Sequence, residues 1–195
     1  MYSTEPTTPV VAVVTAAELA DWLGVDAGDT LLPIMANAAT SAVIEYVQHE
    51  LISRERVVTY QSWPHVGTVT GRTLSPSNAA LINTVKLPYA LNAVVSEVKL
   101  YNELSTDYII QDLKPSQVQF DTVSVLSDDD FPAILITYTS GYGVIDDVPD
   151  ALKVGTLMLA AFMYEHRGEC AADQIINKSG AASYLAPFRF NAVVM

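Results

Sequence analysis

Apolar residues recur at helical spacing in two long segments of the chain. In residues 31–53 the apolar positions are three and four apart, which predicts a long core helix with Pro33 in its first turn. In residues 149–168 nearly every face is apolar, so we expect a helix that is buried nearly all round. The residues predicted to face the core are Leu32, Met35, Ala39, Val43, Tyr46, Val47 and Leu51 in the first helix, and Leu152, Thr156, Leu159, Phe162, Met163 and His166 in the second.

Two shorter helices are predicted beside these long ones. Thr15 followed by Glu18 has the pattern of a capping box, and Gly24 is a natural helix end, so residues 16–23 are expected to form a helix. Its expected buried residues are Leu19, Trp22 and Leu23. A second short helix is expected to run through Leu185 and to stop at Pro187, because proline cannot continue a helix.

Between the helices, the pattern changes to short β-prone runs separated by turn residues. The predicted strands are Val57–Trp63, Val85–Pro88, Val94–Tyr101, Tyr108–Gln111, Gln117–Val125 and Ala133–Tyr138. Gly67, Gly71, Pro76, Ser77 and Asn78 indicate a surface loop between the first two.

The predicted fold is therefore α+β. It is a small helical bundle, with a long N-terminal helix and C-terminal helices, an inserted antiparallel β region and extended terminal arms. The predicted parts are an N-terminal arm at 1–14, a helical core at 15–53 and 146–187, a β-rich insertion at 54–145 and a C-terminal tail at 188–195.

Composition adds a hint of partners. The 195 residues are 50% hydrophobic but only 16% charged, below the roughly 25% charged residues usual in soluble domains. This favours a surface that is partly covered by other proteins. No apolar run reaches the ~20 residues of a membrane span, and residues 1–9 lack the basic start of a secretory signal. Cys170 is the single cysteine, so an internal disulfide is excluded.

The charge is strongly acidic and unevenly distributed. Ten Lys and Arg stand against 22 Asp and Glu, giving a net charge of -12, the wrong sign for gripping a nucleic-acid backbone. No Lys or Arg precedes Arg54, whereas seven carboxylates do. We expect the acidic residues to face solvent or a channel, because unpaired buried carboxylates are costly. The residues concerned are Asp26, Asp29, Asp128, Asp129 and Asp130.

No pattern of catalytic or metal-binding residues is found. His49, His65 and His166 lack ligand spacing, and the turn at Gly141–Gly143 lacks the lysine and third glycine of phosphate-binding loops. The run Asp128–Asp130 is a candidate calcium ligand, but it fits a solvated hairpin tip better, because the alternation of a calcium loop is absent. The glycosylation sequon at Asn177 is interpreted as a chance match. We expect no catalytic, cofactor-binding or metal-binding residues.

Four local motifs in this order resemble the head–tail connector family of tailed bacteriophages, in particular the longer variants of gp6-like adaptors with a β insertion. The motifs are the helix pair that begins at Thr15–Asp26, the strand, turn and helix start at Ile136–Lys153, the segment Tyr164-Glu165-His166-Arg167, and the closing segment Ser179–Arg189. The resemblance covers both ends of the chain. The middle, residues 54–130, matches only in kind.

The resemblance implies a structural subunit without catalytic residues or cofactors. Such subunits form a ring, twelvefold in most particles, beneath the portal protein in the neck of the virion. The ring extends the DNA channel, through which DNA would pass without specific binding, and it contacts a downstream tail terminator, stopper or tail tube. The protein would be made in the host bacterial cytoplasm and would not bind a membrane. A tail-completion, decoration or other neck protein, and more remotely a small hydrolase with a dispersed triad, remain as alternatives.

The C-terminal segment is the candidate portal-binding element. It follows the last predicted helix and is strongly apolar, with one charge, and two aromatic side chains in a partner groove would give several kcal/mol. The alternative is that this segment folds back on its own core. The residues proposed to bind portal are Pro187, Phe188, Arg189, Phe190, Val193, Val194 and Met195.

Overall fold

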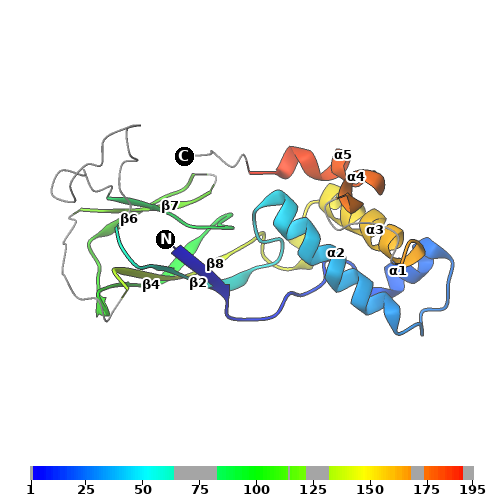
Figure 1. The fold of residues 1–195 in the computed structure, drawn as a ribbon, viewed down its shortest axis with the longest axis horizontal. Coiled ribbons are helices and arrows are strands. Elements are labelled where there is room, and N and C mark those ends of the chain that lie inside the picture. Colours follow the sequence, from blue (N-terminus) through cyan, green and yellow to red (C-terminus); the bar gives the residue numbers. More distant parts are fainter. Residues whose placement is uncertain (1, 64–82, 114, 122–131, 168–173, 191–195) are drawn as a thin grey trace, which may run out of the picture. The chain divides into compact units, whose positions relative to one another are not determined.

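The computed structural model describes residues 2–63, 83–113, 115–121, 132–167 and 174–190 (Figure 1). The predicted α+β class is confirmed: helices and antiparallel sheets are both present. The chain divides into two compact units. A helical unit comprises residues 8–53 and 141–190, and a β unit contains residues 2–7 and 54–140.

The helical unit is built around one central helix. Helix α3 (Asp150–Glu165) contacts α1 (Ala16–Leu23), α2 (Leu31–Val47), α4 (Ile175–Lys178) and α5 (Ala182–Leu185). Between Ala151 and Tyr164 every residue of α3 is buried or half-buried, as the apolar pattern predicted. The short 3-10 helices η2 (Ile145–Asp147) and η3 (Ala186–Phe188) flank this bundle in the sequence.

The start and end of α1 follow its sequence signals. The Thr15 hydroxyl accepts from the Glu18 N–H at 3.2 Å, and the Glu18 carboxylate accepts from the Thr15 N–H at 2.7 Å. This capping box lowers the pKa of Glu18, chiefly through the hydrogen bond from the Thr15 backbone. Gly24 ends the helix in the left-handed conformation, with φ of 69°. The prediction that Trp22 is buried is wrong: its side chain is 54% exposed, because spacing alone could not identify the outer side of so short a helix.

The prediction that the first long helix extends to residue 53 is also wrong. Helix α2 ends at Val47 because Gln48 adopts the left-handed conformation, with φ of 62°, and its N–H bonds to the Ile44 carbonyl. The apolar spacing continues past this point, and Leu51 is fully buried, but it is buried from a turn rather than a helix. Periodicity therefore located the core residue without locating the helix end.

The β unit contains two antiparallel sheets. One has the order β1-β2-β8-β4-β5 and the other the order β3-β7-β6 (Figure 1). The strands are β1 (Tyr2–Pro6), β2 (Arg54–Tyr60), β3 (Thr84–Lys86), β4 (Val94–Leu100), β5 (Glu103–Leu104), β6 (Tyr108–Gln111), β7 (Gln117–Phe120) and β8 (Ile134–Ser140).

The predicted N-terminal arm is divided between the two units. Residues 2–6 pair with β2 as an edge strand, with Tyr2 opposite Tyr60. Val13 and Val14 are instead buried in the helical unit, where the Val13 N–H donates to the Thr40 hydroxyl at 3.2 Å. The extended conformation expected for this segment is therefore fixed by sheet pairing at its start and by helix contact at its end.

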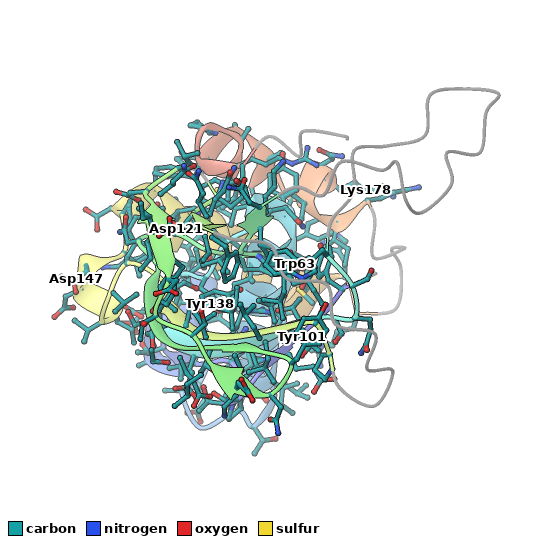
Figure 2. All side chains as sticks on the ribbon, turned by 90° about the vertical axis from the view of Figure 1, so that its left-hand side faces the viewer. Trp63, Tyr101, Asp121, Tyr138, Asp147 and Lys178 are labelled. Carbon is teal, nitrogen blue, oxygen red and sulfur yellow. The ribbon has the colours of Figure 1, made fainter. Side chains whose placement is uncertain are left out.

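Both sheets contribute to one hydrophobic core in the β unit. Trp63 packs edge-on against Phe120 of the smaller sheet, with ring centroids 5.1 Å apart. Tyr138 of the larger sheet is fully buried and donates its hydroxyl to the Pro88 carbonyl. Figure 2 shows Trp63 and Tyr138 among the side chains of this crowded region, whereas Asp147 projects outward from the helical unit. The hydrogen bond satisfies the one polar group that Tyr138 brings into the core.

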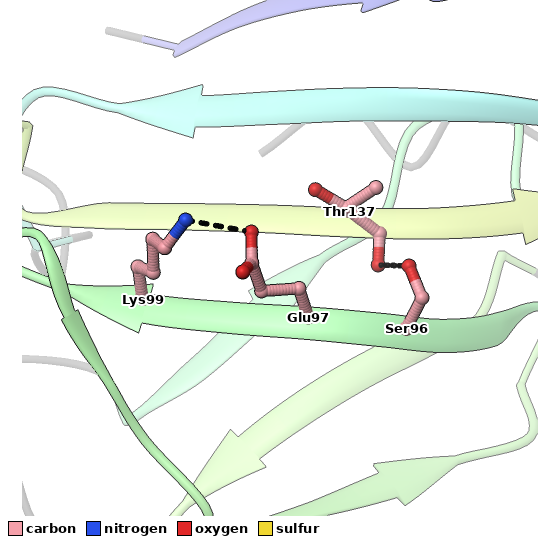
Figure 3. Close-up of polar contacts among 4 residues, drawn as sticks. All are labelled: Ser96, Glu97, Lys99 and Thr137. Carbon is pink, nitrogen blue, oxygen red and sulfur yellow. Dashed lines mark hydrogen bonds and ion pairs between the residues drawn. The ribbon is translucent and has the colours of Figure 1, made fainter.

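One irregularity interrupts the larger sheet. The pairing of β4 with β8 shifts between Val95 and Glu97, so Ser96 has no partner residue in the register. Its hydroxyl bonds to the Thr137 carbonyl at 3.1 Å, and on the same strand Lys99 forms an ion pair of 2.9 Å with Glu97 (Figure 3). At this bulge the Thr137 carbonyl therefore accepts a hydrogen bond from a side chain.

Two backbone hydrogen bonds close the corner at Gly141–Gly143. The Tyr142 N–H donates to the Leu51 carbonyl at 3.1 Å, and the Ser53 N–H donates to the Gly143 carbonyl at 2.8 Å. Gly141 has φ of 133°, and a Cβ there would lie 2.7 Å from backbone atoms of Ile52. The glycine-rich turn is therefore a structural corner, as the sequence indicated, and glycine is required by both conformation and space.

Replacing Gly141 by alanine is expected to lower the free energy of unfolding by about 3 kcal/mol, because backbone strain and overpacking add. Gly24→Ala is the matched control: its φ of 69° is also left-handed, but no atom lies within 4 Å of the added Cβ. We expect about 1 kcal/mol there. Urea denaturation followed by circular dichroism measures both. Equal losses at the two positions would contradict the steric account of the corner.

Candidate docking segment and acidic turn

The C-terminal segment is anchored to the helical unit as far as Phe190. The Phe190 side chain is only 8% exposed, and its N–H donates to the Val47 carbonyl at 2.9 Å. This carbonyl lies at the C-terminal end of α2, where helix carbonyls lack partners within the helix. The segment therefore supplies a partner for the last carbonyl of α2 and packs at the end of this helix.

His49 holds this segment from the other side. The ring is 1% exposed, with Nε2 3.1 Å from the Phe188 carbonyl oxygen and Nδ1 3.1 Å from that of Glu50. Its centroid is 4.9 Å from that of Phe190 and 5.7 Å from that of Tyr142. His49 is thus a packing and hydrogen-bonding residue that joins the C-terminal segment to the Gly141–Gly143 corner. The sequence did not predict this role, because His49 is far from Tyr142 and Phe190 along the chain.

For Phe190 the structure agrees with the alternative left open by the sequence, because this residue packs on its own helical unit. The reason is that the end of α2 offers Phe190 both an aromatic neighbour and an unpaired carbonyl. Pro187 and Arg189 are exposed and Phe188 is half-buried, with the Arg189 guanidinium 5.1 Å from the Tyr46 ring centroid. Val193, Val194 and Met195 lie outside the described residues. The portal-binding role of this segment stays a prediction.

The acidic turn between α1 and α2 is partly open to solvent. Asp26 is exposed, and its carboxylate accepts the Gly28 N–H at 2.8 Å. Asp29 is half-buried: one carboxylate oxygen accepts the Leu31 N–H at 2.9 Å and the other accepts the Tyr164 hydroxyl at 2.6 Å. Asp29 is therefore more than a solvated charge, since it links the turn to α3. Asp128, Asp129 and Asp130 lie outside the described residues.

Tyr164 and Arg167 support this link from the end of α3. The Arg167 Nε donates to the Tyr164 carbonyl at 2.8 Å, and the guanidinium lies 4.5 Å from the centroid of the Tyr164 ring. The Tyr164 hydroxyl lowers the pKa of Asp29, while the same hydrogen bond raises the pKa of Tyr164. The motif Tyr164–Arg167 thus has a structural use here. The sequence could not pair it with Asp29 because the two are far apart along the chain.

Within the described residues, no three His, Cys, Asp or Glu side chains converge as metal ligands do. His166 stacks on Phe162, with centroids 4.2 Å apart, and contacts the Phe162 carbonyl. His65 and Cys170 lie outside this part of the chain. None of the described helices is long and apolar enough to cross a membrane.

Sequence comparison identifies no relative: no family model matches the chain, and a search of curated proteins finds no match.

Several solved structures have a fold similar to this one over 98% of the chain. One similar solved structure is a chain in the neck of an empty GTA particle, determined with C6 symmetry. It is 19% identical, with a TM-score of 0.74 over 98% of this chain and 97% of that chain. A chain in the neck of a native GTA particle, determined with C12 symmetry, is 20% identical with a TM-score of 0.70 over the same shares. A third, from the virion of a native gene transfer agent (GTA) particle, is 16% identical with a TM-score of 0.66. At these identities the likeness establishes the fold.

Phe190→Ala is expected to destabilise the helical unit by about 3 kcal/mol, because it removes a large buried ring beside His49. Pro187→Ala, at an exposed position of the same segment, should change stability by less than about 0.5 kcal/mol. Urea unfolding followed at 222 nm measures the difference. An unchanged unfolding midpoint for Phe190→Ala would show that the segment contributes nothing to its own unit.

Tyr164→Phe is expected to raise the pKa of Asp29 toward its ordinary value, because the hydroxyl that stabilises the carboxylate is lost. Since the folded pKa of Asp29 is lowered, its contribution to stability is present above the unfolded carboxyl pKa and is lost as pH falls through the folded pKa. The variant should therefore be less stable than the original chain at neutral pH and equally stable in acid. Carbon-detected NMR titration and urea unfolding test this, with the exposed Tyr184→Phe as control. An unmoved Asp29 pKa would contradict the link.

Proposed function

We propose that the chain is a structural subunit of the ring-shaped head–tail connector in the neck of a tailed phage or phage-like particle. In this role it lies between the portal and the next neck or tail protein and extends the DNA channel. The observation that carries the proposal is the fold match over 98% of the chain to chains in GTA necks. The C6 and C12 symmetries under which those necks were determined support a ring of copies.

The positions of the family-like motifs support this proposal independently of the fold comparison. The capping box begins α1, the Gly141–Gly143 corner joins β8 to α3, and the Tyr164–Arg167 motif holds the acidic turn. The closing motif places Leu185 against Gly155 of α3, where an added Cβ would lie 2.7 Å from the leucine side chain. Each motif therefore has a specific place in the architecture, which reduces the chance that their shared order is accidental.

The charge suits a channel through which DNA must move. The segments of the helical unit, residues 8–53 and 141–190, contain 12 Asp and Glu against 4 Lys and Arg in the sequence. A surface of this sign repels phosphates, so DNA slides along it without being held. The exposed Asp26 is a candidate for such a surface.

The proposed portal-docking element is the segment from Pro187 to Met195. Phe190 anchors the segment to its own unit, so the docking contacts are assigned to Pro187, Arg189 and the apolar residues that follow Phe190 in the sequence. Those residues are Val193, Val194 and Met195. Anchoring at Phe190 would hold their starting point in place, which lowers the entropy lost on binding.

The test is co-sedimentation of the purified chain with rings of the portal protein from the same particle. The original chain is expected to co-sediment, and deletion of residues 191–195 is expected to abolish this while leaving the helical circular-dichroism signal and melting temperature nearly unchanged. Val94→Thr, at an exposed position of the β unit, should co-sediment normally. No binding by the original chain would overturn the connector role. Binding by the truncated chain at unchanged affinity would place the docking surface elsewhere.

A further inference from the structure

One buried side chain has hydrogen bonds that depend on its protonation. His49 is 1% exposed, and each of its two ring nitrogens lies 3.1 Å from a backbone carbonyl oxygen. Nδ1 faces the carbonyl of Glu50 in the same turn, whereas Nε2 faces the carbonyl of Phe188 in the C-terminal segment. A carbonyl oxygen only accepts hydrogen bonds. Each contact is therefore a hydrogen bond only when that ring nitrogen carries a proton.

The imidazolium form of the ring satisfies both contacts. A neutral imidazole has one N–H group and one unprotonated nitrogen, whereas the imidazolium has two N–H groups. Whichever tautomer the neutral ring adopts, a nitrogen lone pair then faces a carbonyl lone pair at 3.1 Å. In a buried place such an unsatisfied pair of acceptors is costly. The geometry around His49 therefore favours the charged ring.

The aromatic neighbours of His49 also favour the charged ring, whereas burial opposes it. The ring centroids of Phe190 and Tyr142 lie 4.9 and 5.7 Å from that of His49, and aromatic rings attract cations within about 6 Å. Desolvation acts the other way, because it disfavours the charged form. However, burial also keeps water from replacing a lost hydrogen bond, so the two carbonyl acceptors count for more here than they would at the surface.

Titratable groups on each element around the ring bear on its charge. Glu50, the next residue in the turn, is also 1% exposed, so the same turn buries an acid that can balance a charged ring. At the corner, burial raises the pKa of Tyr142 above its ordinary value, and this side chain stays neutral where histidine titrates. In the C-terminal segment, Arg189 is exposed and lies over the Tyr46 ring, so solvent screens its charge.

We infer that His49 is a proton-dependent clamp on the C-terminal segment. With both protons in place, the ring donates to the Phe188 carbonyl on one side and to the Glu50 carbonyl on the other. Loss of one proton to solvent turns one of these hydrogen bonds into a repulsive contact, and the ring no longer holds both carbonyls. The anchored state therefore binds more protons than the released state, so anchoring weakens as pH rises. Phe190, which packs on the same ring, is released as well.

Hydrogen exchange at the Phe190 amide measures the clamp in the full-length chain, because this N–H is protected while it donates to the Val47 carbonyl. After correction for the intrinsic exchange rate, its protection is expected to fall about tenfold between about pH 5.5 and about pH 8.5. His49→Gln keeps an amide donor but does not titrate, so protection in this variant should not vary with pH. His166→Gln is the matched control. His166 also contacts a carbonyl through Nδ1, at the end of α3, and this variant should behave as the original chain does.

Protection that stays constant or rises with pH in the original chain would overturn the clamp, as would an equal fall in His49→Gln. If His49→Gln fails to fold, a chain with both His65→Gln and His166→Gln replaces it, because the sequence has three histidines and this variant keeps His49 alone. The nitrogen NMR shifts of its isotope-labelled ring must then show two protonated nitrogens wherever the Phe190 amide is protected. One unprotonated nitrogen there would refute the clamp. These measurements use no portal protein, so co-sedimentation with portal decides the connector role separately.

Discussion

The helical unit depends on two backbone hydrogen bonds between residues 51–53 and residues 141–143. The segments that supply α2 and α3 are separated in the sequence by residues 54–140 of the β unit, so their packing requires a long loop to be closed. The entropy of closure rises only slowly with loop length, and two main-chain hydrogen bonds fix the ends in one geometry. Gly141 permits this because no side chain lies between the two backbones. The corner thus holds the two ends of residues 54–140 together at the base of the helical unit's two long helices.

His49 extends the same constraint to the C-terminal segment. It contacts Tyr142 of the corner and Phe190 of the segment, and its two ring nitrogens lie near backbone carbonyls on either side. The end of α2, the corner and the C-terminal segment are therefore parts of one packed region. Substitutions at two of these places should have non-additive effects on the free energy of unfolding, because neighbours that share contacts are energetically coupled.

The sequence predicted what depends on local rules and missed what depends on distant partners. The sequence located the capping box of Thr15 and Glu18, the glycine corner and the strongly periodic helix α3. Each of these features depends on residues that are close together in the sequence. The end of α2 was placed too late, because apolar spacing continues through Leu51 after the backbone has turned at Gln48. Trp22 was assigned to the core together with Leu19 and Leu23, yet its side chain is 54% exposed, because spacing does not identify the outer side of so short a helix. The link between Asp29 and Tyr164 and the docking of Phe190 on Val47 require the fold itself.

In the proposed ring, charge and adhesion must come from different parts of the chain. Twelve net negative charges per copy would accumulate around a narrow channel, and at physiological ionic strength screening acts only over about 8 Å. Repulsion between neighbours would then oppose assembly wherever carboxylates approach one another. Main-chain hydrogen bonds and apolar contacts are insensitive to this repulsion, so we expect contacts between copies to be made by such groups and not by carboxylates.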